Sequence, residues 1–150
     1  MKKNRILIIS ISILVLFTVC LAILHSVTRE PVTPGTIQIV CGDQTMEISL
    51  DSIERSAVHG SVVDGKGEEH TVDADGVLLA DFLENVGITA VSQVTVFADD
   101  EYSATVSADE LYEEDRVYLL LRDGDRPQII VFRDSNSKRN VRSVVRLVVS

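Results

Sequence analysis

Five basic side chains lie close together near the C-terminus and are the strongest candidates for binding chemistry. They fall within 14 residues: Arg133, Lys138, Arg139, Arg142 and Arg146. Guanidinium groups bind phosphates and carboxylates, often through two parallel hydrogen bonds. If residues 141–149 form a strand, Arg142 and Arg146 point the same way. We therefore expect Arg139, Arg142 and Arg146 to contact an anionic ligand or partner; the alternative is that these side chains pair with acidic neighbours.

The loop containing Asp99 and Tyr102 is the next candidate contact, while the other candidates for chemistry are incomplete. His59 and His70 lie on adjacent expected strands, but zinc requires three or four ligands. Two Asp- and Gly-containing segments, 73–76 and 123–125, lack the oxygen spacing of a calcium loop. The sequence has no nucleophile elbow, phosphate loop or dinucleotide fingerprint. We therefore predict no catalytic residue and no metal site.

The N-terminal segment predicts a membrane anchor. Residues 6–24 contain no charged side chain, and at ~1.5 Å per residue they would form roughly 28 Å of helix, about the thickness of a bilayer core. Three basic residues among residues 1–5 keep the N-terminus in the cytoplasm by the positive-inside rule. We expect a single-pass membrane protein. Signal-peptide cleavage or lipidation at Cys20 are alternatives, and both also place the domain outside the cytoplasm.

The rest of the chain predicts a linker over residues 25–35 and one acidic domain over residues 36–150. Residues 1–28 hold three of the 14 Lys and Arg and none of the 23 Asp and Glu, so the remainder has a net charge of −12. Such a domain is repelled by nucleic acid, and we predict no nucleic-acid partner. Cys41 is its only cysteine, so the domain depends on its hydrophobic core rather than on a disulfide.

The pattern of this domain predicts an α+β fold that is mostly β, in mixed sheets with two or three short helices. Alternating apolar residues between turn residues predict strands over 36–41, 46–50, 57–63, 68–72, 91–97, 102–106, 117–121, 128–132 and 141–149. Capping boxes over 51–54 and 107–110 predict two helix starts. Asp75 is expected to cap a third helix over 77–86, which Gly87 ends.

Four segments occur in an order found in one protein family. They are ISLDSI at 48–53, GVLLADFLENVGI at 76–88, the hairpin 94–106 with ADDEY, and RNVRSVVRL at 139–147 after the strand 128–132. Together they resemble the oxidoreductase molybdopterin-binding domain, which is the catalytic domain of sulfite oxidase. The resemblance covers nearly the whole domain and implies the fold of the sulfite oxidase middle domain.

The resemblance also implies where a cofactor would be held. In that family a cysteine thiolate ligates molybdenum on a strand that aligns near residues 57–64, and this chain has no cysteine there. We therefore expect a reduced, non-catalytic form without cofactor: an anchored binding or accessory module that contacts an envelope protein or a small anion and supports electron transfer in the envelope. The alternatives are a molybdopterin-dependent oxidoreductase with atypical ligands and a calcium-stabilised envelope module.

Overall fold

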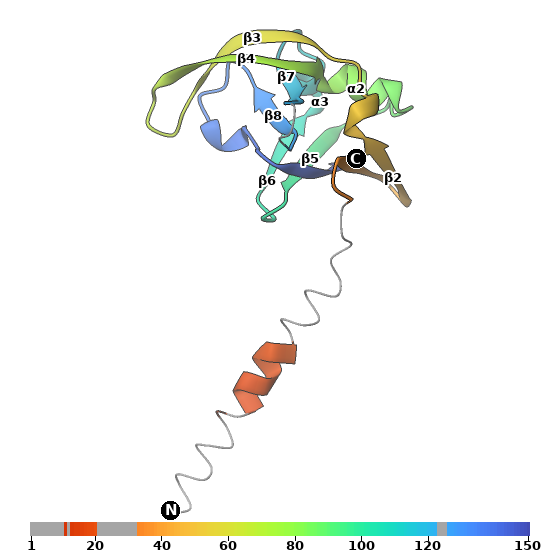
Figure 1. Ribbon diagram of the computed structural model, residues 1–150, viewed down its shortest axis with the longest axis vertical. Coiled ribbons are helices and arrows are strands. Elements are labelled where there is room, and N and C mark those ends of the chain that lie inside the picture. Colours follow the sequence, from red (N-terminus) through yellow and green to blue (C-terminus); the bar gives the residue numbers. More distant parts are fainter. Residues whose placement is uncertain (1–10, 12, 21–32, 123–125) are drawn as a thin grey trace, which may run out of the picture. The chain divides into compact units, whose positions relative to one another are not determined.

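The computed structural model describes residues 11, 13–20, 33–122 and 126–150, and the chain forms two compact units, Met1–Pro31 and Val32–Ser150. In the first unit, residues 11 and 13–20 are helical (Figure 1), and their side chains are exposed. The rest of the expected membrane segment 6–24 lies outside the described residues. Within the described ranges, no helix combines the length and the apolar character needed to cross a membrane.

The second unit contains two β-sheets with short helices, which confirms the predicted α+β class. Sheet A has the spatial order β2 (Gln44–Ser49), β1 (Thr36–Cys41), β9 (Val144–Val149), β5 (Gln93–Ala98) and β6 (Ser103–Ser107). Sheet B has the order β3 (Ser56–Val63), β4 (Glu69–Leu78), β7 (Val117–Leu120) and β8 (Gln128–Val131). The helical elements are η1 (Leu50–Ser52), α2 (Leu79–Asn85), α3 (Ala108–Leu111) and η2 (Ser137–Arg139). Sheet A is mixed, because β1 and β9 are parallel and its other pairs are antiparallel.

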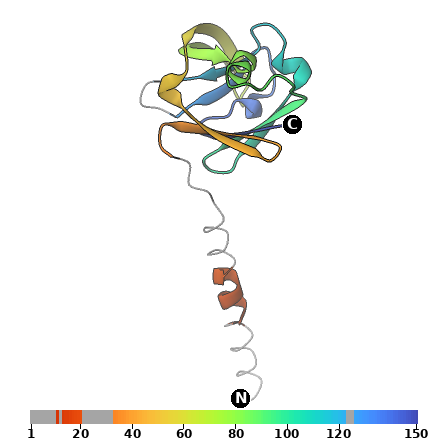
Figure 2. The ribbon, with the colours of Figure 1, turned by 90° about the vertical axis from the view of Figure 1, so that its right-hand side faces the viewer.

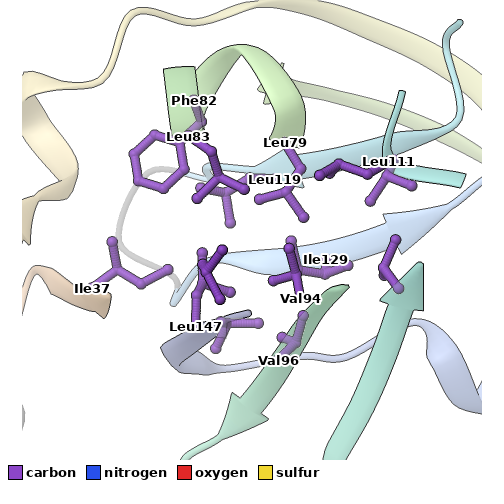
Figure 3. Close-up of a cluster of buried hydrophobic side chains, with 14 of the residues drawn as sticks. Ile37, Leu79, Phe82, Leu83, Val94, Val96, Leu111, Leu119, Ile129 and Leu147 are labelled. Atoms are coloured by element: carbon purple, nitrogen blue, oxygen red, sulfur yellow. The ribbon is translucent and has the colours of Figure 1, made fainter. Parts of the chain in front are cut away.

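The main core lies between sheet A, sheet B and α2. Alternate residues of each strand point to one face, so a half-buried strand needs apolar residues at every second position. Figure 3 shows Leu79, Phe82 and Leu83 of α2 across the core from Ile37 and Leu147 of sheet A. Each is at most 2% exposed, and burial of one such side chain contributes roughly 1.5–3 kcal/mol.

A second, smaller core holds the β3–β4 hairpin against the other face of β7 and β8 (Figure 1). Val58 and Val72 of the hairpin pack there with Leu120 and Phe132. Gly60 permits this approach, because a Cβ at that position would lie 2.6 Å from the Phe132 ring.

Two expected helix starts are wrong. Asp75 lies within β4 and does not cap α2, whose N-cap is Leu78. The strand continues because Gly76 to Leu78 pair with β7, and this tertiary pairing outweighs the local capping signal. The box over 51–54 yields only the three-residue η1, without a side-chain cap. By contrast, the capping box at Ser107 is confirmed, as is Gly87 after α2 with φ 88°.

The last strand begins later than predicted. β9 starts at Val144, and Ser143 before it has the left-handed backbone angle φ 51°. The register with β5 also shifts between Phe97 and Ala98, which indicates a bulge. Arg142 therefore precedes the strand, and the expectation that Arg142 and Arg146 share one strand face is wrong.

Candidate functional site

Arg139, the first of the expected anion ligands, is already bound by two carboxylates of the domain. Its guanidinium holds Glu110 through two contacts, Nη2–Oε1 at 2.7 Å and Nη1–Oε2 at 2.8 Å. Its Nε donates to Asp134 at 2.5 Å. Glu110 is positioned by the capping box that begins α3, because its carboxylate also accepts bonds from Ser107.

These contacts belong to a larger ion-pair network. Its members are Glu110, Glu113, Arg116, Arg133, Asp134 and Arg139. The hydrogen bond from Arg139 lowers the pKa of Glu110 from 4.5 to about 2, against the opposing effect of burial. The same bond, followed by that to Asp134, raises the pKa of Arg139. Arg139 and Arg133 thus serve the fold, as the alternative of acidic pairing predicted.

Lys138, Arg142 and Arg146 differ from these two. None of them forms an ion pair with any residue that the structure describes. The guanidinium of Arg146 lies over the Phe97 ring, 4.4 Å from its centroid, and its buried Nε has no hydrogen-bond partner. Lys138 and Arg142 are exposed. We refer to Lys138, Arg142 and Arg146 as the basic surface.

Asp99 and Tyr102 lie in the β5–β6 turn, beside this surface. The Tyr102 hydroxyl donates to the Lys138 carbonyl at 2.5 Å, and the Asp99 amide donates to the Ser143 carbonyl at 3.0 Å. The Asp99 carboxylate pairs with Arg126 at 2.7 Å. The structure thus brings Asp99, Tyr102 and the segments of Arg142 and Arg146 together around one turn, whereas the Arg139 side chain is paired with acids.

A shallow groove beside α2 was not predicted from the sequence. It has a volume of about 430 Å³, and Glu54, Asp81, Asn85, Asp115 and Tyr118 are among its lining residues. The Tyr118 hydroxyl donates to Asp115 at 2.7 Å, and burial together with Asp115 raises its pKa to about 12. The phenol therefore stays protonated at neutral pH. The lining residues come from separate segments, which a linear motif cannot reveal.

The tip of the β3–β4 hairpin gathers three potential metal ligands. Ligand atoms of Asp64, Glu68 and His70 lie within 4.8 Å of one another, and such mixed donors suit divalent transition metals. Asp64 also accepts bonds from the turn backbone, and the Glu68 amide, followed by His70, lowers its pKa. The hairpin register brings these residues together, and no known metal-binding motif has their sequence spacing.

The two histidines do not meet across the hairpin as the sequence suggested. His59 is paired in register with Asp73, and their side chains approach to 3.0 Å, whereas His70 is paired with Val62. His59 and Val62 lie three residues apart on one strand, so the two histidines lie on opposite faces. Of the two Asp- and Gly-containing segments without calcium-loop spacing, 73–76 lies within β4 and 123–125 lies outside the described residues.

Comparison with known proteins adds no relative: no family model matches the sequence, and no curated protein matches it. The resemblance to the molybdopterin-binding domain therefore stays a prediction based on four short segments.

Proposed function

We propose that this chain is a membrane-anchored, extracytoplasmic binding module that is not an enzyme and that contacts its partner through the basic surface. The observation that carries the proposal is the lack of ion pairs at Lys138, Arg142 and Arg146 within the described part of the chain. The domain has about twice as many acidic as basic side chains. Unpaired cations in such a domain are available to an acidic partner. Complementary charge accelerates the association of two such surfaces.

The proposed location rests on the N-terminal sequence. The uncharged segment 6–24 follows three basic residues, which favours an anchor with the domain on the outer side. The net negative charge of the domain disfavours anionic lipid as its partner. The ligand that we favour is an envelope protein or a small anion, which the unpaired cations of the basic surface would contact locally.

The residues present do not fit a molybdopterin. Ser56–Val63, the strand nearest to the expected thiolate, has no cysteine. Arg139, the cation expected to meet an anion, is bound by Glu110 and Asp134. Elemental analysis of the full-length protein from native membranes checks this point: we expect no stoichiometric molybdenum, and one molybdenum atom per chain would establish the oxidoreductase alternative instead.

The binding function is tested by photo-crosslinking of the full chain in native membranes. A photoreactive residue replaces Ser103, which is exposed and is paired in register with Phe97, the residue beneath Arg146. The control position is Thr71, exposed on the β3–β4 hairpin. We expect a discrete adduct from position 103 and none from position 71. The same adducts from both positions, or none from either, would contradict the proposal.

A further inference from the structure

Sheet A has a second face that belongs to neither core. Phe97 and Thr95 of β5, Arg146 and Val148 of β9, and Val40 of β1 are half-buried and are absent from both core clusters. Cross-strand pairs join Phe97 with Arg146 and Val148 with both Thr95 and Val40. Sheet B and α2 lie on the other side of sheet A (Figure 2). We refer to these five residues as the outer face.

The outer face has one positive charge near its centre. Arg146 lies on the central strand of the sheet. Its Nε is buried without a partner, whereas its terminal nitrogens are not buried and bond to no described residue. The Phe97 ring holds the guanidinium in place and removes water from one side of it, which strengthens its interaction with an incoming anion.

An acid on the same side of the sheet, Glu47, is engaged by threonine hydroxyls. Glu47 is separated from Arg146 by one strand, since both are paired in register with Gln38. Its carboxylate accepts the Thr36 hydroxyl at 2.6 Å, and hydrogen bonds from Thr33 and Thr36 lower its pKa. The apolar neighbours of Arg146, by contrast, offer no charge to pair with it.

We infer that the outer face is the docking surface for a segment of a different protein, in which an acidic side chain lies among apolar ones. The inference rests on the proposed binding function and names its partner class. The partner's carboxylate would pair with Arg146, and its apolar side chains would cover Val40, Phe97 and Val148. A charge without an ion pair, bordered by apolar side chains as Arg146 is by Phe97 and Val148, suits an interface with a partner of complementary charge.

Two other occupants fit less well. A free anion on the outer face would contact a single guanidinium and no surrounding hydrogen-bond donors. An exposed ion pair of that kind contributes little binding free energy. A second copy of this chain would bring another domain with a net charge of −12, which opposes association. Charge complementarity therefore favours an acidic segment of another protein.

The test places the photoreactive residue at Thr95, which is paired with Val148 on the outer face, in the full chain in native membranes. The adduct is identified by mass spectrometry, in the wild type and in Arg146→Glu. Arg122→Glu is the matched control, because Arg122 is also exposed and forms no ion pair with a described residue. We expect an adduct with an Asp- or Glu-containing segment, reduced at least about tenfold by Arg146→Glu and unchanged by Arg122→Glu.

Each other outcome overturns the inference. An adduct that survives Arg146→Glu, maps to a basic segment or joins two copies of this chain excludes the proposed partner. An adduct at Ser103 without one at Thr95 leaves the binding function intact and removes the outer face from it, whereas no adduct at either position overturns both. Thr105, paired with Thr95 on the same side of the sheet, is a second labelling position should Thr95 variants fail to fold.

Discussion

Arg139 and Arg142 lie three residues apart, and the fold treats them in opposite ways. Arg139 is 23% exposed and holds Glu110, 21% exposed, and Asp134, 9% exposed. Arg142 is exposed and pairs with no described residue. The difference comes from their surroundings: η2 places Arg139 against the acidic start of α3, whereas Arg142 follows η2 and precedes β9. One run of basic residues thus contains a structural part and a part available for binding.

The largest expected effect separates these two parts by stability. Arg139→Met leaves Glu110 and Asp134 without their cation, and we expect it to lower the free energy of unfolding by about 2–4 kcal/mol. Arg142→Met, the matched control, should change it by less than about 0.5 kcal/mol. Urea denaturation measures both. Equal losses in the two variants would remove the distinction between network and surface.

A pH titration tests the network without changing Arg139. The folded-state pKa of Glu110 is lowered from 4.5 to about 2, so the stability it contributes is present above pH 4.5 and is lost as the pH falls towards 2. This loss amounts to about 3 kcal/mol. We expect Glu110→Gln to be less stable at pH 7 and to show a correspondingly smaller decline between pH 4.5 and 2, measured by urea denaturation.

The control for this titration is Glu84→Gln, because Glu84 is an exposed residue of α2 with no ion pair among the described residues. It should keep the acid-dependent loss of the wild type. If Glu110→Gln declines as steeply as Glu84→Gln, the acid sensitivity comes from other carboxylates and the network does not hold Glu110 as described.

The same contrast shows how far the sequence predicts the structure. Alternating residues predicted where the strands lie, apart from the late start of β9 and the extension of β4 to Leu78, and the capping box at Ser107 and Gly87 were found in place, because these signals are local. Glu110, one of the two partners of Arg139, is 29 residues away, and only the packing of η2 beside β6 and β8 brings it near. Likewise, Asp75 is a residue type that often caps helices, but it lies within β4 because this strand continues to pair with β7. Local patterns therefore predicted helices and strands, whereas tertiary contacts decide which charged side chains form ion pairs.

Tyr102→Phe tests what holds the basic surface in position. The Tyr102 hydroxyl donates to the Lys138 carbonyl at 2.5 Å, and its loss should lower the free energy of unfolding by about 0.5–1.5 kcal/mol. Without this bond, the backbone amides of η2 should exchange hydrogen faster. Tyr112→Phe is the control, because Tyr112 is similarly exposed and its hydroxyl bond to Thr89 is longer, at 3.3 Å. An equal or larger effect of Tyr112→Phe on η2 would show that the Tyr102 bond does not fix this segment.

The smallest expected effect on stability is that of Lys138→Gln combined with Arg142→Gln. Neither side chain has an ion pair to lose within the described residues, so the free energy of unfolding should change by less than about 0.5 kcal/mol. If the basic surface contacts an acidic partner, the adduct from Ser103 should nevertheless fall, and fall less at higher salt, where the charges are screened. A loss of more than about 1 kcal/mol would instead assign these cations to the fold, and the comparison with Arg139 would no longer separate structure from binding.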